Sequence, residues 1–244
     1  MRYLCKVSYD GTSYCGWQKQ PKLHNSVQEC IEEKLKKILN SKITIHGAGR
    51  TDKGVHACSQ CFHFDSDRPI ADIGKFVYSL NRLLPDDIKI ISIAGVSDDF
   101  HARFQAKEKK YLYKINTSQK NPFSIRYEYQ LMRRLNIDEM IEASKIFVGE
   151  HNFMNFTSKT TDSKEYIRNI YSLSIADKEG LVSIVITGDG FMRYMVRMIV
   201  GALIQVGLGK LSIDELKSLF AFTPRKIVKY KAPANGLYLL DIIY

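Results

Sequence analysis

The sequence predicts an α+β fold with a largely antiparallel sheet. Short segments in which apolar and polar residues alternate lie between segments whose apolar residues recur at helical spacing. Several of the predicted strands follow one another directly, as in hairpins, and the chain has no strict strand–helix–strand alternation. This mixture is typical of helices packed on an antiparallel sheet.

The first predicted strand covers residues 2–9, where Tyr3, Cys5, Val7 and Tyr9 alternate with the residues between them. The turn signal Lys178-Glu179-Gly180 separates two segments that are expected to pair as a hairpin. The other predicted strands are 43–46, 56–64, 88–93, 110–116, 170–176, 181–187 and 237–243.

Helix starts are marked by capping residues. Ser26 and Glu29 form a capping-box pattern ahead of apolar residues at helical spacing, and Ser212 with Glu215 repeats it before a short helix. Asn136 begins a predicted helix that Gly149 closes. Further helices are expected over 73–84 and, as a long apolar helix ended by Gly207, over 192–206.

Each half of the chain runs strand, helix, strands, helix, and no low-complexity linker separates the halves. We therefore expect two similar subdomains, 1–105 and 106–244, that share one central sheet flanked by helices, with the functional site between them. The first subdomain would carry the Arg-Thr-Asp loop at residues 50–52, and the second would complete the cleft around the functional site.

The chain is strongly basic. Its 244 residues include 36 Lys and Arg against 26 Asp and Glu, which gives a net charge of +10 and a pI near 9.3. Such a surplus favours a polyanionic partner, because each neutralised phosphate releases condensed counterions. The alternative is a basic surface without a specific partner.

The sequence also indicates in which compartment of the cell the protein is expected. The first residues lack the apolar stretch of a signal peptide, and the longest apolar region, 191–208, is interrupted by Arg193, Arg197 and Gln205. Five cysteines at scattered spacings suit reduced thiols better than a disulfide framework. We expect a cytoplasmic protein without a membrane span.

The segment 47–57, Gly-Ala-Gly-Arg-Thr-Asp-Lys-Gly-Val-His-Ala, is the most informative of the chain. Its glycines allow backbone conformations that other residues resist, and they enclose Arg50, Thr51 and Asp52. A carboxylate confined beside a guanidinium serves either as a structural ion pair or as a chemical group.

Two further segments combine cations with aromatic rings. The first is the run 107–114, which overlaps the strand predicted over 110–116. In a strand, Lys109, Tyr111 and Tyr113 share one face, which suits a base-stacking groove or, alternatively, a packed aromatic pair with lysines in solvent. At the start of the long predicted helix, Arg193 and Arg197 are four residues apart, so they are expected on one helical face. A partner for them would be Asp52 or a phosphate.

The segment 56–63 has the appearance of a metal site, since a Cys-x-x-Cys lies between His56 and His63. In a strand, however, Cys58 and Cys61 point to opposite faces, and the pattern of a zinc-dependent base deaminase is not met. The chain also lacks the glycine-rich nucleotide motifs and the serine-hydrolase elbow. We expect neither a metal nor a cofactor.

Taken together, these segments resemble the bacterial tRNA pseudouridine synthase A family. The resemblance runs from end to end, in order and spacing. Its motifs are Tyr9-Asp10-Gly11-Thr12, Gly16-Trp17-Gln18, Ser26-Val27-Gln28, the segment 47–57, Phe100-His101-Ala102-Arg103-Phe104, Lys110-Tyr111, Gly149-Glu150-His151-Asn152-Phe153, Met195-Val196-Arg197 with Gly201, and Ala232-Pro233-Ala234-Asn235-Gly236-Leu237.

The resemblance implies the pseudouridine synthase fold and an isomerase that converts uridine to pseudouridine at positions 38, 39 and 40 of the tRNA anticodon stem-loop. In this reaction the N1–C1′ bond breaks, the uracil turns, and the base rejoins the sugar through C5, without redox change. It further implies a homodimer.

The resemblance also implies the roles of individual residues. Asp52 is similar to the indispensable catalyst, which either attacks C1′ or promotes an eliminated sugar intermediate. Tyr111 resembles the residue that stacks on the target base, and Arg197 the arginine that keeps the aspartate ionised. Arg50 resembles a residue that helps displace the target base from its stack. The remaining residues expected to bind substrate are Lys110, Arg193 and His56.

Two other classes of protein remain as alternatives. A non-catalytic RNA-binding protein would explain the charge and the basic-aromatic strand, but it would not require Arg50, Asp52 or Arg197. A structural basic protein would explain neither the strand nor the loop.

Overall fold

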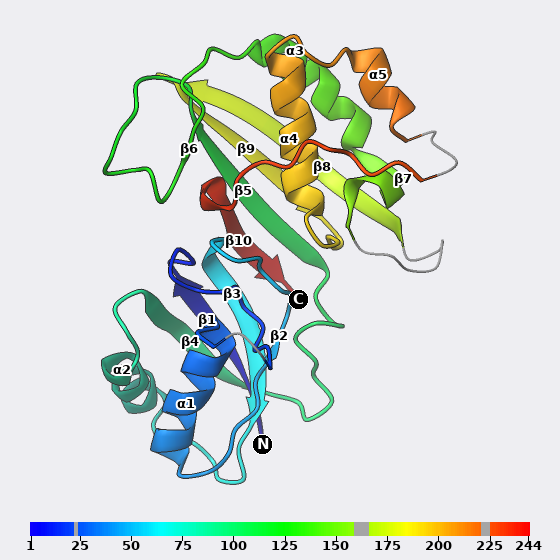
Figure 1. Ribbon diagram of the computed structural model, residues 1–244. Helices are drawn as coiled ribbons and strands as arrows, with labels where there is room; N and C mark the ends of the chain where they lie inside the picture. The colour runs from blue at the N-terminus through cyan, green and yellow to red at the C-terminus, as the bar shows by residue number, and fades with distance from the viewer. Residues whose placement is uncertain (22–23, 159–165, 221–224) are drawn as a thin grey trace. The chain divides into compact units, whose positions relative to one another are not determined.

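The computed structural model describes residues 1–21, 24–158, 166–220 and 225–244. The chain divides into two compact units, Met1–Lys107 together with Tyr238–Tyr244, and Glu108–Leu237. Each unit consists of a sheet with helices packed on it (Figure 1). The predicted α+β class with a mainly antiparallel sheet is confirmed.

The sheet of the first unit has the strand order β4-β1-β3-β10, and β2 pairs with β3. The strands are β1 (Arg2–Tyr9), β2 (His46–Gly47), β3 (His56–Asp65), β4 (Ile88–Val96) and β10 (Leu237–Ile243). β1 runs antiparallel to both β3 and β4, whereas β10 runs parallel to β3. The alternate burial predicted for residues 2–9 is confirmed, because every second side chain of β1 is buried.

The closing strand begins and ends where the sequence predicts, at Leu237 and Ile243. Its partner within the first unit is β3, with Tyr238 opposite His56 and Leu239 opposite Ala57. Residues 238–244 therefore belong with residues 1–107, whereas the sequence division placed them in the second subdomain. A strand pairs by register and not by position along the chain, so the last residues can complete the first sheet.

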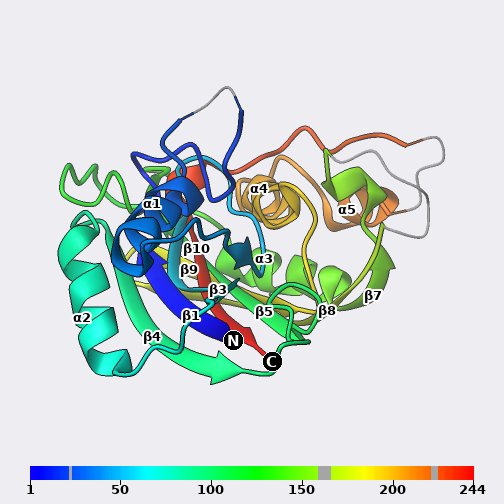
Figure 2. The same ribbon diagram turned by 90° about the horizontal axis from the view of Figure 1, so that it is seen from below.

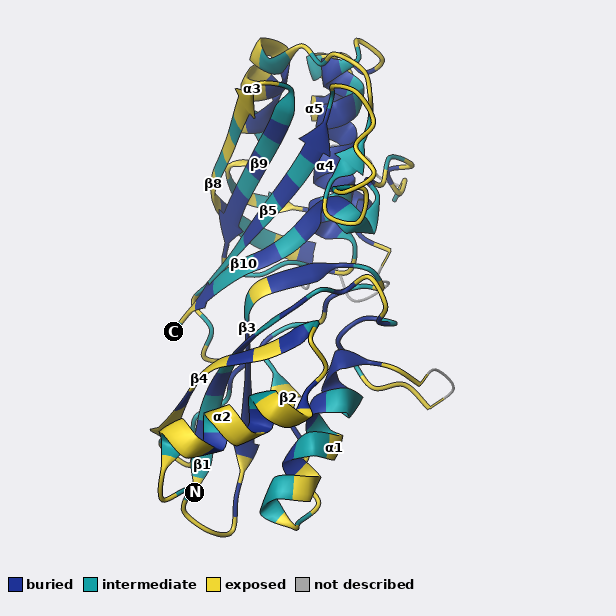
Figure 3. Cartoon of the chain, turned by 90° about the vertical axis from the view of Figure 1, so that its left-hand side faces the viewer, coloured by how far each residue is buried: buried dark blue, intermediate teal, exposed yellow. Residues whose placement is uncertain are grey.

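The helices of the first unit are α1 (Val27–Leu39) and α2 (Ile73–Leu83). Ser26 caps α1 by accepting a hydrogen bond from the Glu29 backbone N–H at 3.1 Å, the first of the two bonds of the predicted capping box. The Glu29 carboxylate accepts from the Asn25 N–H at 3.1 Å, one residue before the position that the box requires. The apolar stripe of α1 is buried, and in Figure 1 this helix lies in front of β1 and β3. α2 packs against β4 and presents an exposed face (Figure 3).

The strand predicted over 43–46 is shorter than expected, since β2 covers His46–Gly47 alone. Ile43 and Ile45 are buried, but the backbone of Ile45 is bonded to side chains of α1. Its N–H donates to Glu32 Oε1 at 3.1 Å and its carbonyl accepts from Gln28 Nε2 at 3.2 Å. Because α1 satisfies these backbone groups, they have no need of a strand partner.

The sheet of the second unit has the order β5-β9-β8-β7 and is antiparallel at each of these pairings. Its strands are β5 (Glu108–Asn116), β6 (Tyr129–Gln130), β7 (Gly149–Asn152), β8 (Ile167–Lys178) and β9 (Leu181–Gly188). The short β6 runs parallel to β5. The predicted hairpin is confirmed as β8 and β9, joined at Glu179 and Gly180, both with positive φ.

The helices of the second unit are α3 (Ile137–Ser144), α4 (Met195–Gly207) and α5 (Ile213–Ser218), with 3-10 turns at Lys145–Phe147, Met154–Phe156 and Ala234–Gly236. Figure 2 shows α4 end-on beside the strands, and Figure 3 shows it buried along most of its length. Asn136 caps α3, and Ser212 and Glu215 form the predicted capping box of α5. None of the helices in the described part of the chain has the length and apolarity that a bilayer crossing requires.

α4 begins three residues later than the sequence predicts. Tyr194, directly before it, has left-handed backbone angles, φ 65° and ψ 0°, which end the helical path on the N-terminal side of Met195. The expectation that Arg193 and Arg197 share one helical face is therefore wrong, since Arg193 lies outside the helix. The two arginines are instead close to each other because both guanidinium groups lie over the ring of Tyr194.

Candidate active site

The predicted site residues are distributed over both units, and each set is described within its own unit. Those of the first unit are Arg50, Asp52 and His56. Those of the second are Lys110, Tyr111, Arg193 and Arg197.

In the first unit, the Arg-Thr-Asp segment lies in the loop that joins β2 to β3, and buried side chains hold it in place. The hydroxyl of Thr51 lies 2.9 Å from the phenolic oxygen of Tyr9, on β1. The amide of Gln60, a fully buried residue of β3, donates to the Gly49 carbonyl at 3.0 Å. These two bonds fix the loop on both sides of Arg50.

Trp17 provides a second support for this loop. Its ring has 1% of its surface exposed and packs on Tyr9 and Phe62, with centroid distances of 6.0 and 5.9 Å. Its backbone N–H donates to the Thr51 carbonyl at 3.1 Å. At Gly47 a β-carbon would lie 2.3 Å from the indole nitrogen, so only glycine allows this approach.

Gly16 brings the backbone of the Trp17 segment against the same loop. Its φ is +108°, and an added β-carbon would lie 2.6 Å from the Thr51 carbonyl oxygen and 3.2 Å from the Asp52 carbonyl carbon. The loop backbone is thus in close contact on the side of Gly16. Glycine is required here both by its dihedral angle and by the available space.

Within this fixed loop the side chains turn from the interior to the surface. Thr51 is buried, Asp52 is half-buried and Lys53 is exposed. The loop is closed after Asp52 by a hydrogen bond from the Val55 N–H to the Asp52 carbonyl at 3.1 Å. The backbone that carries the carboxylate is therefore held before and after it, which is the preorganisation that a catalytic group requires.

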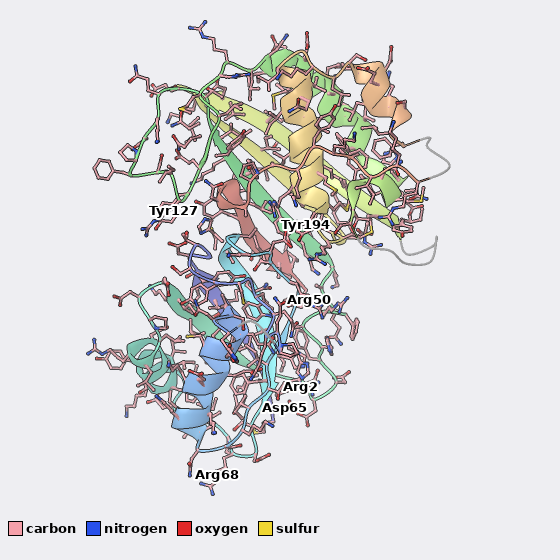
Figure 4. The ribbon with its side chains drawn as sticks, in the orientation of Figure 1. Arg2, Arg50, Asp65, Arg68, Tyr127 and Tyr194 are labelled. Atoms are coloured by element: carbon pink, nitrogen blue, oxygen red, sulfur yellow. The ribbon has the colours of Figure 1, made fainter. Side chains whose placement is uncertain are left out.

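Arg50 lies exposed at the start of the loop (Figure 4). Its Nε donates to Gln18 Oε1 at 3.2 Å, and Gln18 in turn donates to Gln28 Oε1 at 2.7 Å. Gln28 donates to Glu32 Oε1 at 2.9 Å, so a chain of side chains connects Arg50 to α1. This chain directs the guanidinium while leaving it at the surface.

His56 is buried, with 2% of its surface exposed, and it stacks on the ring of Tyr238 at 4.8 Å. Its Nδ1 accepts from the Gly11 N–H at 3.1 Å and lies 3.0 Å from Asp10 Oδ1. Asp10 Oδ1 also accepts from the backbone and the hydroxyl of Thr12. His56 thus ties residues 10–12 to the first residue of β3.

In the second unit, Tyr111 and Tyr113 lie on the buried side of β5, whereas Lys110 is half-buried. Tyr111 packs edge-to-face on Phe191, with ring centroids 5.2 Å apart. The hydroxyl of Tyr113 donates to the Pro233 carbonyl at 2.8 Å, and burial raises the pKa of Tyr113. The two tyrosines are packed side chains and do not form an open platform.

Arg197 lies in the first turn of α4 and is bound to the segment before β10. Its Nε donates to the Ala232 carbonyl at 2.8 Å, and the Ala232 N–H donates back to the Arg197 carbonyl at 2.9 Å. Its guanidinium carbon lies 5.4 Å from the centroid of the Tyr194 ring. Arg193 reaches the same ring and donates to the Tyr194 hydroxyl at 3.0 Å.

The residues of the apparent metal motif face different surroundings. Cys61 is fully buried and Cys58 is exposed, as their positions in a strand predict. His63 packs against His46 and His101, with ring centroids 4.9 and 4.7 Å away. Within the described residues, no group of three or more His, Cys, Asp or Glu is placed to hold a metal ion.

Several contacts that build these two sites do not follow from the sequence pattern. Tyr9 and Gln60 support the loop from β1 and β3, and Tyr194 and Lys231 belong to the cluster around Arg197. The alternation of the first strand places Tyr9 on the core side, but a sequence pattern does not give its partner. Lys231 has no sequence signal that links it to Tyr194.

Comparisons with known proteins agree with this arrangement of motifs. The family model of the tRNA pseudouridine synthases matches residues 6–105 and 143–244. A tRNA pseudouridine synthase A 2 of Bacillus cereus is 39% identical over 98% of each chain. The tRNA pseudouridine synthase A of Acetivibrio thermocellus is 41% identical over 98% of this chain and 97% of that protein. The protein of the same name from Bacillus subtilis is 40% identical over 100% of this chain and 99% of its relative.

Among solved structures, a chain of a Cbf5–Nop10–Gar1 complex aligns with a TM-score of 0.39 and 14% identity, over 83% of this chain and 45% of that chain. A likeness of this size adds nothing to the assignment. The family model and the relatives define the class as pseudouridine synthases. This chain belongs to the tRNA pseudouridine synthase family.

Proposed function

We propose that this protein is an isomerase that converts uridine to pseudouridine in tRNA. The proposal is supported by membership of the family and by relatives about 40% identical over nearly the whole chain. The net charge of +10 suits a polyanionic substrate. The reaction exchanges one bond of the sugar for another. The N1–C1′ bond breaks, the C5–C1′ bond forms, the proton at C5 is lost, and N1 gains a proton.

The observation that carries the catalytic part of the proposal is the fixed loop around Asp52. A half-buried carboxylate on a backbone held by Tyr9, Trp17 and Gln60 is placed with little freedom. We propose Asp52 as the catalytic carboxylate, either as the nucleophile at C1′ or as the group that promotes elimination. Both roles require an ionised carboxylate beside positive charge that develops on the sugar.

We propose supporting roles for the other predicted residues. Arg197 keeps Asp52 ionised. Tyr111, packed on Phe191 with 8% of its surface exposed, stacks on the target base once substrate binding uncovers its ring. Arg50, exposed on the loop, occupies the space of the displaced base, while Lys110 and Arg193 contact the substrate backbone.

His56 requires a different kind of role. Because its side chain has 2% of its surface exposed, His56 does not contact the substrate directly. We propose that it acts by holding residues 10–12, through its hydrogen bond with the Gly11 N–H. This keeps His56 in the proposed site as a residue that orders the substrate-binding surface.

The decisive experiment compares pseudouridine formation by the wild type and by Asp52→Asn, in an unmodified tRNA transcript with uridine at position 39. Asparagine removes the charge and nearly keeps the shape. We expect activity in the wild type, none in Asp52→Asn, and RNA binding in both. Asp86→Asn, at an exposed aspartate, is the matched control and should remain active. An active Asp52→Asn variant would exclude Asp52 as the catalyst.

The target positions and the assembly state are further parts of the proposal. We propose modification at positions 38, 39 and 40 of the anticodon stem-loop by a cytoplasmic homodimer. Transcripts with uridine at one of these positions at a time separate the three activities. A monomer at micromolar concentration in light scattering would contradict the dimer.

A non-catalytic RNA-binding protein is the second candidate, favoured by the high positive charge alone. It predicts that the wild type binds tRNA without forming pseudouridine. The zinc-dependent base deaminase, whose sequence pattern is not met, requires a stoichiometric metal, so analysis of the purified protein for zinc tests it independently.

A further inference from the structure

Tyr194 combines two features that are rare in one residue. Its backbone is left-handed, with φ 65°, which is unfavourable for a residue with a large side chain. Its ring is surrounded by three cations. The guanidinium carbons of Arg193 and Arg197 lie 4.8 and 5.4 Å from the ring centroid, and the Lys231 ammonium lies 4.4 Å from it. Figure 4 shows Tyr194 beside the N-terminal end of α4, which begins at Met195.

The three cations come from two segments that are fastened to each other. Arg193 and Arg197 flank the start of α4, and Lys231 lies in the segment that leads to β10. The two hydrogen bonds between Arg197 and Ala232 hold these segments together, one residue away from Lys231. Arg193 is fixed separately by its hydrogen bond to the Tyr194 hydroxyl at 3.0 Å. The cluster is therefore built by tertiary contacts.

Two of the three cations, Arg193 and Lys231, have no acidic partner within the part of the chain that the structure describes. The face of an aromatic ring attracts cations but carries no net charge, so the cations still repel one another. Both Arg193 and Lys231 are exposed, so an anion from solution can reach them. An anion between them would relieve this repulsion.

We propose that Arg193 and Lys231, held on the ring of Tyr194, form a binding site for a phosphodiester group of the RNA substrate. This inference rests on the proposed function for the identity of the anion. A phosphodiester carries one negative charge and several acceptor oxygens, which match a planar guanidinium and an ammonium. Because Arg197 shares the same ring, the bound phosphate lies close to a proposed catalytic group.

The test measures how the affinity for an unmodified tRNA transcript depends on salt. The logarithm of the association constant falls linearly with the logarithm of the salt concentration, and each lost phosphate contact makes this negative slope shallower by about 0.7 to 0.9. We expect this change, with several-fold weaker binding, for Lys231→Gln and for Arg193→Gln. Lys229→Gln removes the same charge from an exposed position of the same segment and is expected to leave the slope and the activity unchanged.

The role of the ring is tested by a second pair of variants. Tyr194→Phe keeps the aromatic face and loses the hydroxyl, whereas Tyr194→Leu loses both at similar backbone cost. We expect near wild-type affinity for Tyr194→Phe and weaker binding for Tyr194→Leu, with both variants folded by circular dichroism. Equal affinities for the two would show that the ring does not hold the cations.

The outcomes separate this inference from the proposed function. If Lys231→Gln and Arg193→Gln behave like Lys229→Gln while the wild type is active, the phosphate site and the proposed backbone contact of Arg193 are wrong, and the proposed isomerase activity stands. If the slopes change but the wild type forms no pseudouridine, the phosphate site stands and the proposed function is wrong.

Discussion

The phenolic oxygen of Tyr9 lies 2.9 Å from the hydroxyl oxygen of Thr51, and both side chains are buried. This contact connects β1 directly to the residue before Asp52. Burial raises the pKa of Tyr9, and the hydrogen bond to Thr51 opposes this effect in part. The neutral phenol is the form present at physiological pH, and it can donate or accept in this contact.

Removing the Tyr9 hydroxyl is expected to loosen the catalytic loop. Tyr9→Phe takes away the partner of a buried hydroxyl, which costs about 1–2 kcal/mol of the free energy of unfolding. We also expect a lower rate of pseudouridine formation, because the backbone next to Asp52 loses a support. Urea unfolding and single-turnover rates measure the two effects.

Tyr78→Phe is the matched control for this prediction, since 69% of the surface of Tyr78 is exposed. It should change neither stability nor rate. If Tyr9→Phe is destabilised but reacts at the wild-type rate, the contact with Thr51 serves folding alone.

Gly16→Ala is expected to displace the same loop from the other side. The new β-carbon would meet the Thr51 carbonyl oxygen at 2.6 Å, and the backbone φ of +108° is unfavourable for alanine. We expect a loss of about 2 kcal/mol or more in stability and a large loss of activity. Gly95→Ala, where no atom lies within 4 Å of the added carbon, should be tolerated. Similar stabilities of the two variants in thermal unfolding would contradict the close packing at Gly16.

The packed rings of His46, His63 and His101 predict how the free energy of unfolding depends on pH. Burial, together with the neighbouring His46, lowers the pKa of His63 to about 4, and the pKa of His101 is also lowered, first by burial. Between the folded value and the unfolded value near 6.5, the unfolded chain binds more protons than the folded one. The stabilisation by neutral His63 is therefore complete above pH 6.5 and is lost as the pH falls toward 4.

We expect the titration of His63 to lower the free energy of unfolding by an amount on the order of 1–2 kcal/mol between pH 7 and pH 5. His63→Gln removes the titrating group, so its stability should fall less over this interval than that of the wild type. Urea unfolding at both pH values measures the difference. His24→Gln is the control, because 84% of the side chain of His24 is exposed. An identical pH dependence of His63→Gln and the wild type would refute the assignment.

Arg197→Lys is expected to keep the positive charge but lose its orientation. Lysine has no planar group to donate from Nε to the Ala232 carbonyl and to lie over the Tyr194 ring at the same time. We expect pseudouridine formation to slow by tenfold or more with little change in RNA affinity. Arg133→Lys, at an exposed position, should be unaffected. A wild-type rate in Arg197→Lys would mean that charge alone is required there.

Local sequence signals gave most of the elements of the fold correctly. The capping residues Ser26, Asn136 and Ser212 begin the helices that they predict, and the alternating pattern of 2–9 gives β1 its observed bounds. These signals act within a few residues, so no knowledge of distant contacts is needed to read them. The Arg-Thr-Asp segment was also recognisable from its own residues.

The differences between prediction and structure arise where distant side chains decide the local conformation. Residues 43–45 have the pattern of a strand, yet Gln28 and Glu32 of α1 bond to the backbone of Ile45. The long helix was predicted from residue 192, yet the left-handed backbone of Tyr194 delays its start to Met195. Neither effect is visible in periodicity, because both depend on partners elsewhere in the fold.

The sequence by itself determined the fold class, most of the helices and strands, the family, and the residues that the family's chemistry points to. These follow from periodicity, capping and motif, which are properties of neighbouring residues. Only the tertiary structure decided that Tyr9, Trp17 and Gln60 hold the loop of Asp52, and that Lys231 joins two arginines on the ring of Tyr194. Such contacts join residues far apart in the chain, and their geometry is fixed only when the sheets and helices pack.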